Sequence, residues 1–240
     1  MAIRFGLVLA VATIATAGQH EVTERVQSAA TVLDEAMTGK DTIPRDLLDK
    51  AHCVVIVPSL KRGAFLGGVQ YGVGVAMCRK ASGYGWSGPS TVRMEGGSFG
   101  LQAGGGETDV ILVVMTKAGA DKLMRSEFTL GGEGAVMIGP LGKAASAETD
   151  AYMRAEILSY SRSRGVFAGI AVKGSTLRSD DGDNAILYGK SVTHADILSG
   201  KYAVPAVAKP LVSKLTTYSK VEEKSSGRID VKTTSAQDVR

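Results

Sequence analysis

Residues 161–189, SRSRGVFAGIAVKGSTLRSDDGDNAILYG, decide the fold predicted for this chain. The stretch opens on Arg162 and Arg164, which fall on one face of an extended strand because side chains alternate along it. An apolar run interrupted by glycines follows. The stretch holds no nucleophile–base pair and no metal-ligand spacing. It therefore predicts a binding surface with a basic approach rather than an active site.

The acidic segment 180–183 (DDGD) separates two apolar runs of this stretch. Asp and Gly favour tight turns, so the pattern predicts a β-hairpin with strands at about 166–178 and 184–189. Gly182 would take the positive φ of that turn. An EF-hand loop needs its Gly at the sixth position, whereas here it is third, so a solvated turn explains these carboxylates better than calcium.

The stretch, taken with earlier blocks of the chain, resembles the core signature of the SYLF domain. The matching upstream blocks are 55–59 (VIVPS), 85–90 (GWSGPS), 97–104 (GSFGLQAG), 128–131 (FTLG) and 157–160 (ILSY). The resemblance covers roughly residues 22–200. It implies a lipid-binding domain of the kind found in fungal endocytic adaptors, which regulate actin, in plant FYVE-containing proteins and in secreted bacterial proteins. We place the chain in the secreted bacterial branch.

Composition and strand patterning predict an α+β domain: a curved, mainly antiparallel sheet closing toward a barrel, with peripheral helices. Gly accounts for 30 of 240 residues and lies inside apolar runs, where it relieves crowding at the bends of a curved sheet. Candidate strands cover 53–57, 65–78, 84–94, 98–103, 109–115 and 128–138. Pro58 is expected to stop the first of them, so that 59–63 forms a basic turn. Residues 151–162 are ambiguous: 152–158 could form a helix, but the pattern of 157–163 favours a strand.

Apolar spacing and capping residues predict the helices. Val22, Val26, Leu33 and Met37 recur at helical steps in a segment that ends near Gly39 and has an acidic polar face. Further helices are expected at 46–51, at 116–124 with Thr116 as cap, at 193–198 as a capped turn that begins at Thr193, and at 205–218 with a break or kink at Pro210.

The N-terminus has the pattern of a signal peptide. Arg4 precedes a short apolar segment, and 15–17 (ATA) fits a cleavage site. Residues 1–17 are therefore predicted to be removed from an exported protein, periplasmic or extracellular; an uncleaved anchor is the alternative. The SYLF-like domain is expected at 19–219, with its core at 50–200, and 220–240 is expected to be a disordered tail.

Export permits a disulfide between Cys53 and Cys78. Each cysteine lies at the end of a predicted strand, so adjacent strands would bring them together. Two free buried thiols are the alternative, and the spacing alone does not decide between them.

Catalytic, metal and nucleic-acid functions find no support in the sequence. A Walker A motif ending at Gly142 would need Gly at Met137 and Ser or Thr at Ala144. Ser98 lacks the spacing of a nucleophile elbow, and nothing nominates a partner for His194 as a base. The three histidines are far apart in the sequence, so no metal site and no cofactor are predicted. Few aromatics and no Lys/Arg stripe exclude nucleic acid.

A basic set remains, and we predict that it binds the headgroups of anionic lipid. Its members are Lys61, Arg62, Arg162, Arg164, Lys173 and Arg178. Arginine forks match phosphate geometry, and the SYLF resemblance implies phosphoinositide or anionic phospholipid as the ligand. Alternatively, the arginines belong to a solvated edge strand whose charges prevent pairing with other chains. Val166, Phe167 and Leu66 would contact acyl chains or, more simply, fill the core.

The predicted function is therefore non-catalytic binding of anionic lipid at a membrane surface in the cell envelope. The alternative is an envelope structural module that binds a protein partner without lipid specificity, and a small hydrolase ranks third. The resemblance departs from the family at the N-terminal helix, which is basic in the eukaryotic adaptors and acidic here.

Overall fold

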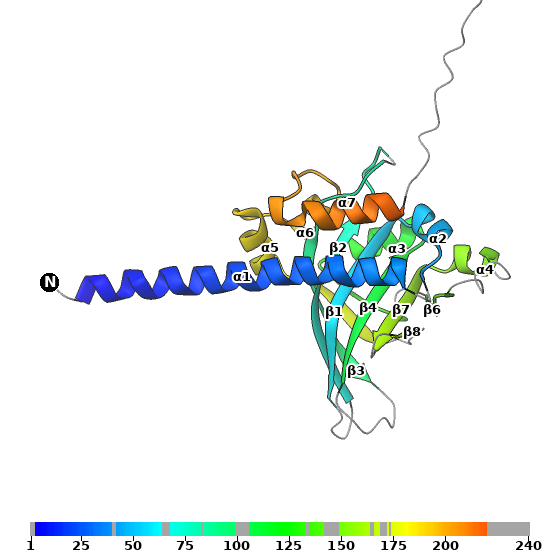
Figure 1. The fold of residues 1–240 in the computed structure, drawn as a ribbon, viewed down its shortest axis with the longest axis horizontal. Helices are drawn as coiled ribbons and strands as arrows, with labels where there is room; N and C mark the ends of the chain where they lie inside the picture. Colours follow the sequence, from blue (N-terminus) through cyan, green and yellow to red (C-terminus); the bar gives the residue numbers. More distant parts are fainter. Residues whose placement is uncertain are drawn as a thin grey trace, which may run out of the picture.

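A curled sheet with helices packed across its convex face forms the two layers of the computed structural model (Figure 1). The structure describes residues 3–39, 42–63, 68–82, 84–98, 106–132, 135–141, 149–163, 166–168, 172 and 174–219. The predicted tail at 220–240 lies outside these residues.

The strands that the described residues form make one sheet. They are β1 (Cys53–Gly63), β2 (Gly68–Cys78), β3 (Ser90–Ser98), β4 (Gly106–Val114), β5 (Glu127–Thr129), β6 (Val136–Ile138), β7 (Ile157–Ser163), β8 (Val166–Ala168) and β9 (Ser175–Ser179). Their order is β5-β9-β3-β2-β1-β4-β7-β6, and β8 also pairs with β7. β6 runs parallel to β7, whereas the other described pairings are antiparallel. The predicted α+β class and the curved, mainly antiparallel sheet are confirmed.

Two apolar clusters cover the two faces of this sheet. One cluster collects alternate side chains from strands at the centre and at both ends, including Val55, Val92, Phe128 and Ile157. Strand side chains make up most of this cluster, as expected inside a curled sheet, so we assign it to the concave face. The other cluster joins the remaining strand positions, such as Ile56, to the helices of the convex face.

Helix α1 (Ile3–Thr38) crosses the convex face. Val22, Val26, Leu33 and Met37 are buried against the sheet, and the predicted helix end is confirmed. The helix also extends back to Ile3, so the predicted signal segment continues the same helix, which projects past the sheet (Figure 1). No helix in the described residues is both long enough and apolar enough to span a membrane.

The shorter helices largely follow their sequence signals. They are α2 (Arg45–Lys50), α3 (Lys117–Leu123), α4 (Thr149–Arg154), α5 (Asp181–Tyr188), α6 (His194–Leu198), a 3₁₀ turn (Ala206–Ala208) and α7 (Lys209–Tyr218). The predicted caps are confirmed, because Thr116 accepts a hydrogen bond from the Gly119 N–H and Thr193 accepts one from Asp196. Pro210 does not break α7: it lies in the first turn, where its missing N–H has no helical partner to lose.

The predicted hairpin in 161–189 is wrong. β8 pairs with β7, β9 pairs with β3 and β5, and the second predicted strand is helix α5. Asp180 caps this helix by accepting the Asp183 N–H at 3.2 Å. Gly182 is helical, and the positive φ falls on Gly189 at the helix end. Asp and Gly are common both in turns and at helix ends, so their presence alone does not distinguish a hairpin turn from a capped helix.

Two other strand boundaries differ from the prediction. Residues 128–138 split into β5 and β6, which lie at opposite ends of the sheet. The strand predicted at 84–94 begins at Ser90 instead, after a single bridge between Arg79 and Trp86. Pro89 just before it has no N–H for a strand ladder. The strand predicted at 98–103 lies outside the described residues beyond Ser98.

Pro58 does not end β1, which continues to Gly63 through a β-bulge. Val57 pairs with Val110 of β4 but Leu60 pairs with Thr108, so β1 holds one extra residue there. A bulge leaves one residue out of the ladder and can thus accept a proline. The predicted basic turn at 59–63 is the second half of a central strand. β2 makes room with glycine, since a Cβ on Gly74 would lie 2.2 Å from the Ile56 carbonyl oxygen.

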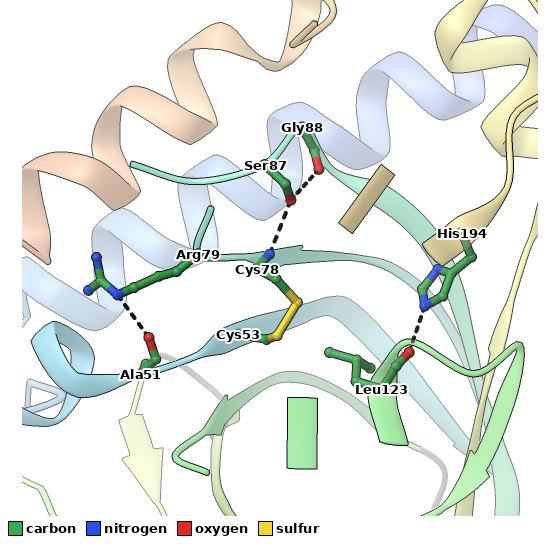
Figure 2. Close-up of a disulfide and its surroundings, with 8 residues drawn as sticks. All are labelled: Ala51, Cys53, Cys78, Arg79, Ser87, Gly88, Leu123 and His194. Carbon is green, nitrogen blue, oxygen red and sulfur yellow. Dashed lines mark hydrogen bonds between the residues drawn. A yellow bond between two sulfur atoms is a disulfide. The ribbon is translucent and has the colours of Figure 1, made fainter. Parts of the chain in front are cut away.

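The upper end of the sheet is closed by a disulfide and an arginine (Figure 2). Cys53 and Cys78 are directly paired in β1 and β2 and form the disulfide with Cα atoms 4.0 Å apart. Arg79 beside it donates to the carbonyl of Ala51 at 2.9 Å and stacks 4.6 Å from the centre of the Trp86 ring. Its other donors reach the carbonyls of Leu48, Asp49 and Ser219. Arg79 therefore ties the ends of α2 and α7 to the sheet.

Candidate functional site

A chain of polar contacts fixes the bulge of β1. Ser59 has φ +49°, a left-handed conformation that is uncommon for a residue with a side chain. Its N–H donates to Oδ1 of Asp109 on β4 at 2.9 Å. Arg162 on β7 approaches the other oxygen of Asp109 and pairs with Glu35 on α1. The four residues thus link α1, β7 and β4 to the bulge.

Arg162 therefore makes contacts within the protein that hold the bulge in place. It is directly opposite Asp109 in the ladder between β4 and β7 and is flanked by two carboxylates. The proposal that β7 is a charge-protected edge strand is wrong, since it pairs with β4 on one side and with β6 and β8 on the other. Opposite charges within a few ångströms satisfy the guanidinium inside the protein.

Arg178 on β9 is likewise engaged. Its guanidinium lies 3.0 Å from Glu127 on β5 and 3.7 Å from Glu95 on β3. Glu127 is its direct cross-strand partner, a placement that favours opposite charges. This pairing cannot be recognised in the sequence, because β3, β5 and β9 are far apart along the chain.

Arg164 and Lys173 lie outside the described residues, as does Leu66. Val166 and Phe167 belong to the described backbone of β8. The structure thus brings Lys61 and Arg62 together at one end of β1 and does not unite them with Arg162 or Arg178.

Lys61 and Arg62 lie near the lower end of β1 in Figure 1 and on opposite faces of the sheet. The bulge determines which of these two residues lies on the concave face. Counting alternately from the concave residue Val57 would put Lys61 inside, but the extra residue puts Leu60 and Arg62 inside. Lys61 is exposed on the convex face, opposite Tyr71 of β2.

Arg62 is half-buried, and burial lowers the pKa of its guanidinium below the usual value. Its Nε is buried and has no hydrogen-bond partner. It forms no ion pair with the described part of the chain, in contrast to Arg162 and Arg178. A guanidinium is charged at every physiological pH, so a half-buried one without a counter-charge raises the free energy of the folded state.

Gln70 and Ser175 lie in the same cross-strand row as Arg62. Arg62 pairs with Gln70 of β2, Gln70 with Gly96 of β3, and Gly96 with Ser175 of β9. The Gln70 side-chain amide donates to the Ser175 hydroxyl across Gly96, and both are buried. This row was not predicted from the sequence. The one available signal was a lone glutamine in the apolar run of β2.

Ser98 and His194, the candidates for catalysis, have positions that belong to the framework of the fold. Ser98 ends β3. His194 is buried, accepts from the Ser90 hydroxyl at Nδ1 over 2.7 Å, and donates from Nε2 to the Leu123 carbonyl over 2.8 Å (Figure 2). A carbonyl only accepts, which assigns the proton to Nε2. In the described residues, no group of three or more His, Cys, Asp or Glu could hold a metal ion.

Comparison with known proteins identifies the family. Residues 95–218, just over half of the chain, match the family described as "Ysc84: Las17-binding protein actin regulator". The chain belongs to the Ysc84 family. This confirms the resemblance to the SYLF domain, the same family under its other name.

Relatives from fungi and mammals are similar along most of the chain. LAS seventeen-binding protein 3 of Saccharomyces cerevisiae is 35% identical over 189 residues, which are 76% of this chain and 40% of that protein. An SH3 domain-containing protein of Schizosaccharomyces pombe is 34% identical over 186 residues, 76% of this chain and 43% of that protein. SH3 domain-containing YSC84-like protein 1 of Homo sapiens is 29% identical over 213 residues, 86% of this chain and 62% of that protein.

The chain thus spans about two fifths of the length of these fungal relatives. Their names describe binding proteins and SH3-containing proteins rather than enzymes. The Ysc84 family description points to an adaptor role connected with actin regulation.

The contact between Asp109 and Ser59 predicts the effect of two matched substitutions. Asp109→Ala removes the acceptor of the Ser59 N–H and is expected to lower the free energy of unfolding by about 1–2 kcal/mol. Asp109→Asn keeps an acceptor oxygen and is expected to cost about half as much. Urea unfolding followed by circular dichroism measures both. Equal losses in the two variants would show that the hydrogen bond to the bulge does not stabilise the fold.

His194 predicts a pH dependence of stability. Burial lowers the pKa of His194, although the Leu123 carbonyl and Asp181 oppose the shift. Protonation therefore favours the unfolded chain, where histidine titrates at a pKa of about 6.5. The stabilisation is present above that pH and is lost as pH falls below it, by at most about 1.4 kcal/mol per pH unit.

His194→Gln keeps a donor toward Leu123 and removes the titrating group, so its free energy of unfolding should fall less than that of the wild type between about pH 7 and pH 5. Urea unfolding at each pH measures the difference. Parallel pH profiles for the two proteins would assign the acid sensitivity to other groups.

Proposed function

We propose that this domain is a non-catalytic module that binds anionic lipid at a membrane surface, using the lower end of the sheet. The observation that carries the proposal is the state of the basic residues. Arg162 and Arg178 already face carboxylates, whereas Arg62 is half-buried without an ion-pair partner among the described residues. An anionic headgroup would supply the counter-charge that Arg62 lacks.

The convex side of the same sheet end supports this proposal. Val69 and Tyr71 on β2 are 64% and 46% exposed, and Lys61 is the cross-strand neighbour of Tyr71. Apolar, aromatic and basic side chains together suit the interface between headgroups and acyl chains, where tyrosine has one apolar and one polar end.

We also propose that the chain is exported, because residues 1–17 have the pattern of a signal peptide.

A protein-binding function is the second candidate. The Saccharomyces relative is named for binding another protein, and this chain has an exposed strand edge that could serve such a role. β6 ends the strand order of the sheet, and its Met137 and Ile138 are 40% and 53% exposed. An added strand from a partner would pair with such an edge.

Vesicle co-sedimentation tests the lipid proposal. The wild type should bind phosphatidylglycerol-containing vesicles more tightly than phosphatidylcholine vesicles, and added salt should weaken this binding. Lys61→Gln with Arg62→Gln should weaken it by roughly tenfold or more, since each basic residue near such a surface contributes about 1 kcal/mol. Arg178→Gln, the matched control, should change it less than about twofold.

Binding without preference for anionic vesicles would reject the lipid proposal in favour of the protein-binding candidate. An effect of Arg178→Gln as large as that of the double substitution would place the lipid surface elsewhere on the sheet.

A further inference from the structure

On the concave face, near the lower end of the sheet, a cross-strand row of polar residues follows a row of apolar residues. Leu60, Met94 and Leu177 form the row above, with Phe128 beside them, and all are buried. In the next row toward the lower end of the strands, Arg62 on β1, Gln70 on β2 and Ser175 on β9 are polar, and Gly96 follows Met94 on β3. The interior of the curl therefore changes from hydrocarbon to hydrogen-bonding groups within one step of the ladder.

The Gln70–Ser175 pair holds this row in place. The amide nitrogen of Gln70 donates to the Ser175 hydroxyl, which leaves the amide oxygen and the hydroxyl proton as further polar groups of the row. Gly96 lies between them without a side chain, and a Cβ there would come within 2.9 Å of the Ser175 Cα and 3.5 Å of the Gln70 amide nitrogen. The glycine lets the glutamine cross β3.

Arg62 is the cation of this row. Its Nε is buried without a hydrogen-bond partner, while the side chain as a whole is only half-buried. Part of the guanidinium thus remains accessible from the end of the sheet. Buried hydrogen-bond donors without an acceptor are rare in folded proteins. A bound ion or ligand that accepts the hydrogen bond is one explanation for a donor of this kind.

We propose that Arg62, Gln70 and Ser175 form a site for a single phosphate group, in which the Arg62 fork binds two oxygens. This rests on the proposed lipid-binding function and deepens it by naming the recognised group and its residues. A planar carboxylate has two oxygens, and the guanidinium fork would use both. A tetrahedral phosphate presents a further oxygen, which the Ser175 hydroxyl proton can meet.

The test compares fork geometry with charge alone. Arg62→Lys keeps the charge and removes the fork, and is expected to weaken binding to vesicles containing phosphatidic acid by about tenfold. Arg178→Lys makes the same change at an arginine that is paired with Glu127 and Glu95, so it is the matched control and should change binding less than about twofold. Ser175→Ala removes one neutral partner and should weaken binding by about threefold. Circular dichroism verifies that each variant is folded.

Vesicles in which oleate supplies the negative charge distinguish phosphate from charge in general. The wild type should bind them more weakly than phosphatidic acid vesicles of equal charge, and Arg62→Lys should lose that difference. Glycerol phosphate should compete with these vesicles for the wild type and not for Arg62→Lys, because the proposed site recognises the phosphate group itself. Absence of competition at the wild type would contradict a site for a single phosphate group.

Equal binding of Arg62→Lys and wild type to phosphatidic acid vesicles would overturn the proposed site while leaving lipid binding by charge intact. Absence of any binding of the wild type to anionic vesicles would instead reject the proposed function itself.

Discussion

The one-residue bulge in β1 determines how the basic residues of this fold are used. β1 lies between β2 and β4, and its side chains contribute to both apolar clusters. An extra residue at the centre of such a strand reverses the alternation of every side chain that follows it. Here the reversal puts Arg62 on the concave face and Lys61 on the convex face.

The bulge in turn is held by a chain of charged residues, one of which, Arg162, is predicted from the sequence to bind lipid. Asp109 accepts the N–H of Ser59, Arg162 lies against Asp109, and Glu35 pairs with Arg162. The acidic face of α1 thereby has a role: it supplies the carboxylate that meets Arg162. One ion pair thus accounts both for an acidic residue of α1 and for the position of Arg162.

Features encoded within one segment were predictable from the sequence. The buried spacing of α1, the caps Thr116 and Thr193, and the strand from Ile157 follow from local periodicity and hydrogen bonding. Glycine frequency also indicated a curved sheet, because Gly72 and Gly74 of β2 are needed where the bulge of β1 presses close.

Features that depend on distant partners were not predictable in this way. Arg162 looked available because Glu35 is far from it in the sequence, and Arg178 because Glu127 lies on another strand. Pro58 indicated a strand end because a bulge cannot be recognised without the opposing strand. The polar row of Arg62, Gln70 and Ser175 comes from three strands brought into register, so no single segment contains it.

The most direct measurement follows the Nε–Hε signals of the arginines in a proton–nitrogen correlation spectrum while inorganic phosphate is added. Arg62→Lys assigns the Arg62 signal by its disappearance, and Arg162→Lys assigns that of Arg162. We expect phosphate to shift the Arg62 signal in a saturable way and to leave the Arg162 signal in place. A saturable shift of Arg162 with no change at Arg62 would contradict the roles that the bulge assigns to these two residues.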